Sequence, residues 1–273
     1  MSGRGKVGVK KKMRIPRTDY HIHTHYLGCA NSTMTLPEII RECQSLGVTS
    51  LAITDHLNTL EQLPRHLKIR QELESMEAEI EIFFGVELNY TSCDGEFAFH
   101  QEIKEEYGFQ FAIGGIHTTY LQEYDLEKLL AIQHRHHLKT CTNPLVDVLV
   151  HPYWFGKGEF ERNNWPWFDS MKPVPVSYIR ELGQVARQTS TAIEINATAN
   201  LCNPHHSASY VQEYLEFLSL LNEEKVCFSF GSDAHSIDQL KAIKTCWEVA
   251  SRLLIPAERI WKPAGKSFVR KKF

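Results

Sequence analysis

The feature that most constrains this chain is a series of metal-type side chains, each placed directly after a short apolar run. The first lies in residues 19–25, Asp-Tyr-His-Ile-His-Thr-His, where His21 and His23 stand two residues apart. On a strand, residues two apart point to the same face, so these imidazoles are expected to converge on one point. Two converging neutral imidazoles are a typical start of a transition-metal site.

The same pattern follows five later apolar runs, and Asp233 and His235 are again two residues apart. A single histidine at a strand end is more often a hydrogen-bonded structural residue. Candidate ligands at six successive strand ends instead indicate one or more metal ions. These candidates are His21, His23, His56, Glu87, His117, His151, Asp233 and His235.

Short β-branched runs alternate with segments of helical period, which predicts βα units around a parallel sheet. Strands are expected at 19–23, 49–54, 80–87, 109–116, 145–150, 192–196 and 226–231. Helices are expected at 35–46, 62–77, 125–138, 177–188, 207–223 and 237–254, while 97–106 fits either an edge strand or a short helix. This alternation predicts a closed or nearly closed α/β barrel, whose chemistry would lie at the C-terminal ends of the strands.

Composition limits the class of protein. The βα pattern extends over most of the 273 residues, which predicts a single barrel domain at 18–273. Seven scattered cysteines without a C-x-x-C pair are typical of reduced thiols in the cytoplasm. No apolar run approaches the ~20 residues of a membrane helix. No apolar stretch follows the basic N-terminus, so a signal peptide is not predicted.

The charge of the chain is unevenly placed. Residues 1–17 hold seven Lys and Arg and no acid, so residues 18–273 carry −10 against −3 for the whole chain. A basic arm of this kind can contact nucleic acid. The body is acidic and shows no basic stripe, which favours a solvated, disordered tail at 1–17.

Six short segments, taken together, resemble the PHP (polymerase and histidinol phosphatase) family. They keep the family's order between residues 19 and 235, and the combination is specific although each piece alone is not. The resemblance implies a distorted (β/α)7, TIM-like barrel that holds a cluster of Zn, Mn or Fe ions and hydrolyses phosphoesters. The segments are Asp-Tyr-His-Ile-His-Thr (19–24), Ile-Thr-Asp-His (53–56), Gly-Val-Glu (85–87), Gly-Ile-His (115–117), Val-His-Pro (150–152) and Gly-Ser-Asp-Ala-His (231–235).

The resemblance also implies a division of the ligands among three metals, with Glu87 bridging the first two. Many members add one histidine or aspartate in the loop after the first strand, where this sequence offers His25 or Asn31. Asn31 is a poor transition-metal ligand, so His25 is the candidate, and two to three ions are expected. The implied sets are His21, His23, Glu87 and Asp233; Glu87, His117 and His151; and His56 with His235.

The expected mechanism is metal-assisted hydrolysis. A hydroxide held between metals attacks phosphorus, and the metals neutralise the phosphoryl oxygens and the leaving oxygen. Glu87, Asp233 and His235 are the predicted catalytic residues. His235, Asp55 or a metal-polarised water would protonate the leaving group, although for Asp55 the simpler interpretation is a residue that orients its neighbours or caps a helix.

The rim of the predicted barrel contains an aromatic-rich segment, 152–175. It is interpreted either as a lid or wall for the substrate, or as a hydrophobic cluster that only covers the barrel end. Several basic residues nearby are candidate phosphate or substrate contacts, although each alone is more commonly a solvated charge. They are Arg65, His66, Lys68, Lys157, Arg162, His205 and His206.

Other residues receive structural interpretations. Glu194 and Asn196 share a strand face and are expected to point inward, as substrate contacts or as partners of the ligands. Cys29 is near the site, but no spacing makes it a nucleophile, so it is interpreted as a packing residue. The histidines of the helix at 125–138 are predicted to be surface residues, away from the strand ends; they are His134, His136 and His137.

The function that follows is a cytoplasmic, metal-dependent phosphoesterase that acts on a small phosphorylated metabolite, as a histidinol-phosphatase-like enzyme would. A nuclease or nucleotide phosphodiesterase is the alternative, because PHP modules also occur with polymerases. A third alternative is a metal-stabilised binding module without turnover. No membrane partner is expected, and the sequence does not indicate an oligomeric state.

Overall fold

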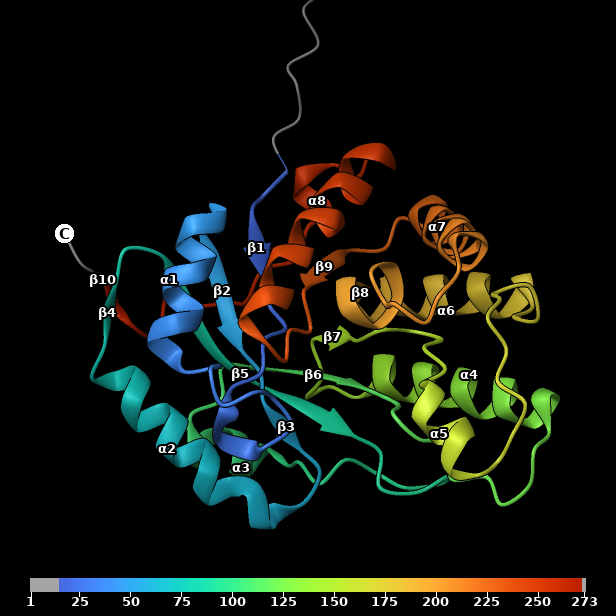
Figure 1. The fold of residues 1–273 in the computed structure, drawn as a ribbon, viewed down its shortest axis with the longest axis horizontal. Helices are drawn as coiled ribbons and strands as arrows, with labels where there is room; N and C mark the ends of the chain where they lie inside the picture. Colours follow the sequence, from blue (N-terminus) through green and yellow to red (C-terminus); the bar gives the residue numbers. More distant parts are fainter. Residues whose placement is uncertain (1–14, 272–273) are drawn as a thin grey trace, which may run out of the picture.

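The computed structural model describes residues 15–271 of the chain (Figure 1). The predicted arm at 1–17 therefore falls largely outside the described residues. None of the helices in the described part combines the length and the hydropathy that crossing a membrane requires. The first strand of the main sheet begins at Thr18 and the last ends at Gly231, so the sheet and its connections include most of the described chain.

Seven strands form one sheet, and every neighbouring pair in it is parallel. A short extra strand, β3 (His56–Leu57), also pairs with β5. Parallel pairing puts the C-terminal ends of all strands at one edge, so residues that follow the strands meet there. In spatial order the strands are β1 (Thr18–Asp19), β2 (Ser50–Ile53), β5 (Glu81–Asn89), β6 (Phe111–Gly115), β7 (Val148–Leu149), β8 (Ala192–Asn196) and β9 (Phe228–Gly231).

The first and last strands meet, which nearly closes the barrel. The Tyr20 amide donates to the Phe230 carbonyl at 2.8 Å, and the Asp233 amide donates to the His21 carbonyl at 2.8 Å. Ile22 and Ala234 form a further parallel bridge. The α/β barrel predicted from the sequence is confirmed, with a shorter first strand because residues 20–23 leave the regular ladder to reach the segment after β9.

Helices connect the strands and cover the outside of the barrel (Figure 1). The segment 97–106, ambiguous from the sequence, contributes a helix, and the last predicted helix begins as a 3-10 turn at Ile237–Ala242. A small second sheet pairs β4 (Glu77–Ala78) with β10 (Arg270–Lys271). The helices are α1 (Leu36–Leu46), α2 (Leu63–Glu74), α3 (Gln101–Tyr107), α4 (Leu126–Thr142), α5 (Lys157–Arg162), α6 (Val176–Thr189), α7 (Ala208–Glu223) and α8 (Ile243–Arg252).

Large side chains fill the barrel interior below the strand ends. Tyr20, Phe83 and Phe111 are buried in a cluster separate from the core between sheet and helices. The Trp261 ring packs against Tyr20 and Phe111, with ring centroids 5.6 and 5.3 Å apart. Burying aromatic side chains of this size is a main source of stability. The barrel interior is therefore filled with side chains, and the candidate ligands lie beyond this cluster, at the C-terminal ends of the strands.

The prediction that the α4 histidines are surface residues is wrong, because all three are buried. His134 bridges the Tyr153 hydroxyl at 2.9 Å and Glu181 at 3.0 Å. His136 donates from Nε2 to the Cys93 carbonyl at 2.7 Å. A buried imidazole needs a hydrogen-bond partner. These contacts supply one, so the histidines of α4 can be buried although they are polar. The α4 sequence pattern does not reveal such partners.

The aromatic segment 152–175 is mostly packing. Tyr153, Phe155 and Phe160 are buried in the main core, and the bulkier rings at 165–168 pack against it. Trp154 differs, because its ring lies edge-on to His117 and His151 at centroid distances of 5.8 and 5.3 Å. Of the two interpretations of this segment, the hydrophobic cluster describes most of it, and Trp154 alone of these four is directed to the strand ends.

Candidate metal centre

The carboxylate of Glu87, near the C-terminal end of β5, lies at the centre of the strand-end residues. Its side chain is fully buried, and its two oxygens face different histidines. Around Oε2 lie His56 Nδ1 at 2.7 Å, His21 Nε2 at 3.2 Å and His23 Nε2 at 3.3 Å. Around Oε1 lie His117 Nε2 and His151 Nε2, both at 3.2 Å. Four strand ends thus deliver five imidazoles to one carboxylate.

Asp233 lies beside this group, just after β9. Its Oδ1 is 3.2 Å from His23 Nε2 and 3.5 Å from His21 Nε2. Asp233 and His151 both have positive φ angles, 54° and 28°, although neither is glycine. Such backbone conformations are costly and cluster at functional sites, where the surrounding structure enforces them.

Glu194 on β8 holds two of the histidines in place. Its Oε1 accepts from His21 Nδ1 at 2.8 Å, and its Oε2 accepts from the His151 amide at 2.8 Å. Asn196 donates to Glu194 Oε2 at 2.9 Å and lies 3.3 Å from Asp233 Oδ2. Residue 231 must be glycine, because a Cβ there would collide with Glu194 Oε1. A carboxylate behind a histidine is the usual support of a metal ligand.

Asp55 supports the ligands from the other side. Its carboxylate accepts from the Thr24 amide at 2.9 Å and from the Thr24 hydroxyl. Its carbonyl accepts from the Glu87 amide at 3.1 Å. Asp55 is buried, and this burial raises the pKa of its carboxyl group to about 7. These contacts fit the interpretation of Asp55 as an orienting residue.

The donor atoms have the arrangement that a cation needs. Because His21 Nδ1 faces Glu194, its proton is expected there, which leaves the Nε2 lone pair directed at His23 and Glu87. His56 Nδ1 and Glu87 Oε2 are 2.7 Å apart, yet neither has a hydrogen-bond partner of acceptable geometry. Buried polar atoms are rarely left without a partner. Divalent ions fit these positions.

The described residues contain three groups of potential ligands, and within each group the ligand atoms lie within 4.8 Å of one another. One is His21, His23 and Asp233, and another is His56, Glu87 and His117. The third group combines Cys29 with three histidines. Its members are His23, Cys29, His56 and His235.

Electrostatics of the cluster favour the metal-binding forms of Glu87, His23 and His117. Burial alone would raise the pKa of Glu87, but His56, His21 and His117 hold it well below its usual range. Burial lowers the pKa of His23 to about 3 and that of His117 to about 4. Burial opposes the charged form of His21 and His56, but the neighbouring carboxylates, Glu194 and Glu87 for His21 and Glu87 for His56, raise the pKa of both rings. A metal ion would therefore displace a proton from these two imidazoles, whereas Glu87, His23 and His117 already have the forms that bind metals.

The loop after β1 differs from the prediction. The His25 ring lies against the Met34 carbonyl, with Nδ1 at 3.1 Å, and is absent from the three ligand groups. Asn31 uses its side chain within the loop, accepting from the Thr33 amide at 3.0 Å. Cys29, interpreted as packing, is exposed and directs Sγ to the histidines. The sequence contained one indication of this: a metal-type residue six positions after His23.

Of the predicted substrate contacts, only His205 lies at the site. It lines a cavity of about 320 Å³ together with His56, His117, Asp233 and His235. His206 turns away, pairs with Asp169 at 2.8 Å and stacks on Tyr210.

The other predicted contacts lie elsewhere. His66 is fully buried and its Nε2 lies 2.9 Å from the His56 carbonyl, so it supports the His56 segment rather than a substrate. Arg65 donates to the Leu27 carbonyl at 3.1 Å. Lys157 lies over the Trp167 ring and near Glu161, while Arg162 and Lys68 are exposed.

A second cavity, of about 350 Å³, shares His117 with the first. Neutral polar groups line it: Asn58, Thr59, Asn89, Thr91, Thr118 and the two tyrosines Tyr90 and Tyr120. The first cavity adds Trp154, Thr198, Ala199, Asn203, Pro204 and Gln239. Within the described part of the chain, neither lining includes Lys or Arg. The sequence predicted the histidines and Asp233, and it placed Trp154 in the aromatic segment interpreted as a lid or wall, but it did not identify the lining of the second cavity.

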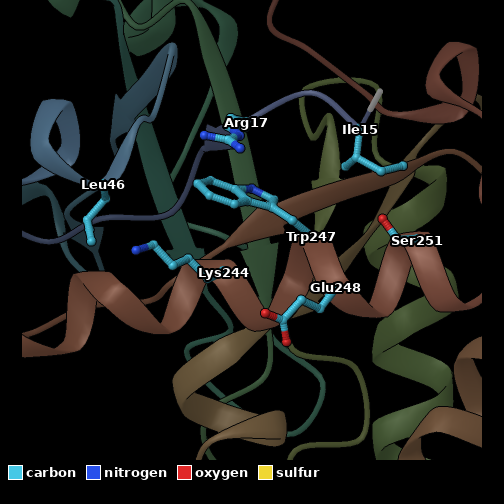
Figure 2. Close-up of a pocket in the computed structure, with 7 residues that line it drawn as sticks. All are labelled: Ile15, Arg17, Leu46, Lys244, Trp247, Glu248 and Ser251. Carbon is cyan, nitrogen blue, oxygen red and sulfur yellow. The ribbon is translucent and has the colours of Figure 1, made fainter. Parts of the chain in front are cut away.

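A third cavity, of about 580 Å³, lies where the chain enters β1 (Figure 2). The Trp247 indole donates to the Thr18 carbonyl at 3.0 Å, and the Arg17 guanidinium lies 5.9 Å from its ring centroid. Lys244 and Glu248 lie on the same helix as Trp247 (Figure 2). This cavity is at the N-terminal end of the barrel strand, whereas the histidine cluster follows the C-terminal ends.

Comparison with known proteins gives a family whose matched region contains most of the candidate ligands. Residues 19–198 match the PHP domain. The chain belongs to the PHP domain family. The match contains the candidate ligand histidines that follow β1, β6 and β7, His56 in β3 and Glu87 in β5, and it ends before Asp233 and His235.

This PHP chain is similar to curated proteins of two kinds. The "Probable phosphatase YcdX" of Escherichia coli (strain K12) is 21% identical over 242 residues, which cover 88% of this chain and 87% of the relative. The "DNA polymerase/3'-5' exonuclease PolX" of Bacillus subtilis (strain 168) is 28% identical over 239 residues, or 83% of this chain. The aligned part is 35% of PolX, so the chain spans about a third of that relative.

A solved structure has the same fold. The "putative histidinol phosphatase hisK from Listeria monocytogenes" superposes with a TM-score of 0.57 at 15% sequence identity. The superposition covers 82% of this chain and 97% of that one. At this identity the likeness establishes the fold, and it agrees with the nearly closed parallel barrel described above.

Proposed function

We propose that this PHP chain is a metal-dependent phosphoesterase that hydrolyses a phosphate monoester of a small molecule. The observation that carries the proposal is the buried Glu87 carboxylate, whose two oxygens face five imidazole nitrogens at 2.7–3.3 Å. A carboxylate between two sets of ligands is suited to bridge two cations. The family match and the phosphatase relative support the same reaction class.

The ligand assignment is part of the proposal. His21, His23 and Asp233 would hold one ion, and Glu87 would bridge it to a second ion at His117 and His151. His56 and His235 would hold a third. Divalent ions at these positions would activate water and neutralise phosphoryl oxygens.

The chain's own residues then position the substrate and the protons. Glu194 and Asn196 keep His21 and Asp233 oriented, so the ligands need little rearrangement during turnover. His235 lines the 320 Å³ cavity and is part-exposed, with Nδ1 3.0 Å from the Asp233 carbonyl. Its Nε2 would hold the third ion, and we propose that a nearby water serves the leaving oxygen.

The cavities favour a monoester over nucleic acid. A polynucleotide brings several phosphates, which proteins neutralise with Lys and Arg. The linings of the two cavities that share His117 contain neither residue among the described positions. Neutral amides and hydroxyls beside an exposed histidine suit a small polar leaving group.

A test uses the full chain, its bound metal counted, with an aryl phosphate monoester and diester as substrates. We expect monoester turnover that chelation abolishes and that Zn, Mn or Fe restores. Glu87→Gln should lower kcat/KM by about 10³-fold or more, because it removes the bridging charge. Glu216→Gln, on the exposed side of α7, is the matched control and should leave turnover unchanged. Turnover that survives both chelation and Glu87→Gln would contradict the proposal.

A second candidate is a nucleic-acid phosphodiesterase, favoured by the 28% identity to a part of PolX. It predicts diesterase activity and 3'-5' degradation of single-stranded DNA in the absence of monoesterase activity. Metal binding without turnover of either ester would instead support a binding module. The same substrate pair therefore separates the three functions.

A further inference from the structure

The loop between β1 and α1 holds Cys29 in a defined position beside the histidines. The 3-10 turn at His25–Leu27 ends at Gly28, whose φ of 82° turns the chain toward the cluster. The Arg65 guanidinium fixes the Leu27 carbonyl at 3.1 Å. The Asn31 amide donates to the His235 carbonyl at 2.7 Å. These bonds tie the loop directly to the segment that carries His235.

The sulfur of Cys29 lies in a converging set of donors rather than alone. Its Sγ and one ring nitrogen each of His23, His56 and His235 are mutually within 4.8 Å. His23 is fully buried, its Nδ1 has no hydrogen-bond partner, and the same holds for Nδ1 of the nearly buried His56. His235 Nδ1 faces a carbonyl, which leaves Nε2 available. The set needs a shared positive centre to satisfy its lone pairs.

We infer that Cys29 is a thiolate ligand of the metal held by His56 and His235. The inference rests on the proposed function, because it assigns the ligand that completes its third metal site. His23 is assigned to the neighbouring ion, since its Nε2 lies 3.3 Å from Glu87 and 3.2 Å from Asp233. When the metal binds, the thiol proton leaves to solvent as the sulfur–metal bond forms.

A thiolate at this position gives the third site a different metal preference from the other two. Sulfur ligands favour Zn and other soft ions, whereas imidazole and carboxylate oxygen also accept Mn. The chain should therefore retain one thiophilic ion when the remaining sites are exchanged to Mn. The Cys29 side chain is solvent-accessible, so the same bond should be sensitive to thiol reagents.

The test loads the full chain with Co²⁺, because cobalt–thiolate bonds absorb in the near ultraviolet and cobalt–imidazole bonds do not. Metal per chain is counted in parallel. Cys29→Ser removes the thiolate, and Cys29→His replaces it with a nitrogen ligand. Cys202→Ser is the matched control, since Cys202 is another exposed thiol, which donates to the Thr245 hydroxyl.

We expect the thiolate band in the wild type and in Cys202→Ser, and its loss in both Cys29 variants. Cys29→His should keep the metal count, and Cys29→Ser should bind one ion at least about tenfold more weakly. A band that persists in Cys29→Ser overturns the inference. So does a wild type that binds its full count of cobalt with no band, an outcome that leaves the phosphoesterase proposal intact. Failure to bind any metal would contradict both.

Discussion

Two groups of buried histidines in this molecule have opposite roles. At the strand ends, ring nitrogens of His21, His23 and His56 converge on Glu87 Oε2, and several donor atoms lack a hydrogen-bond partner. On α4, the histidines point to separate partners, although Nδ1 of His136 and of His137 also lacks a hydrogen-bond partner. His134 bridges Tyr153 and Glu181, and His137 Nε2 accepts from the Tyr153 amide at 3.0 Å.

Burial alone does not identify a metal ligand. Both groups contain fully buried imidazoles, and burial lowers the pKa of His23 and of His137 alike. What separates them is convergence, because within the described chain no α4 histidine belongs to a group of potential ligands.

The first prediction concerns His117, whose Nε2 lies 3.2 Å from Glu87 Oε1. His117→Ala should lower kcat/KM for a phosphomonoester by about 10³-fold and remove about one metal per chain, because a proposed ligand is lost. Steady-state kinetics and metal analysis measure both effects. His137→Ala is the matched variant on α4 and should keep its metals; equal metal loss in the two variants would erase the distinction between the groups.

The second prediction compares two histidine–carboxylate pairs, Glu194 with His21 and Glu181 with His134. Glu194→Gln should weaken metal binding by about 10–100-fold, because the amide no longer holds the His21 proton on Nδ1. Chelator competition gives the affinity. Glu181→Gln should leave it unchanged, since His134 supports only packing. If Glu194→Gln at saturating metal lowers kcat and leaves KM unaltered, the defect lies in the positioning of the ligands and not in substrate binding.

The third prediction concerns stability. His137→Ala removes a fully buried ring and leaves the Tyr153 amide without its acceptor, so it should lower the free energy of unfolding by about 2–4 kcal/mol. Urea denaturation measures this change. His205→Ala, at an exposed position of the cavity rim, should cost less than about 0.5 kcal/mol. A fully stable His137→Ala would show that α4 does not depend on this contact.

The fourth prediction is the pH dependence of stability. Burial holds the pKa of His137 well below its usual value, with His134, His136 and His151 as the facing titratable groups. In the unfolded chain this histidine binds a proton below about pH 6.5, while in the folded chain it stays neutral. Its contribution is therefore fully present above about pH 6.5 and is lost as the pH falls toward the folded pKa.

The variant that tests this is His137→Gln, whose side-chain oxygen can still accept from the Tyr153 amide but cannot titrate. The free energy of unfolding of the wild type, measured by urea denaturation, should fall faster than that of His137→Gln between about pH 7 and about pH 5, by up to ~1.4 kcal/mol per pH unit. Parallel curves would mean that His137 is not the group that responds.

Much of the fold was predictable from the sequence because it depends on local patterns. Alternating apolar runs and helical segments predicted the parallel barrel, and Gly47 with a φ of 80° ends α1 where the sequence predicted it. The ligands were predictable for the same reason. Residues that follow parallel strands meet at one edge, so Glu87 and His117 need no long-range knowledge to be placed together.

The errors arose where a side chain's role depends on its partner. His25 and Cys29 belong to the same loop, and only the turn at Gly28 decides which of them faces His235. His66 was a candidate substrate contact because of its charge, but it is buried against the His56 carbonyl. Glu194 was expected to point inward, yet its link to both His21 and His151 required the barrel to close.

Periodicity and the order of short motifs were therefore sufficient to predict the family, the barrel and the residues at its strand ends. The tertiary structure decided which imidazoles converge, which are tied to neutral partners, and that a cysteine rather than His25 faces the third group. The physical reason is that a ligand site depends on the directions of lone pairs within a few ångströms. Those directions are set by residues distant in the chain, such as Arg65 and Glu194, that the local pattern does not contain.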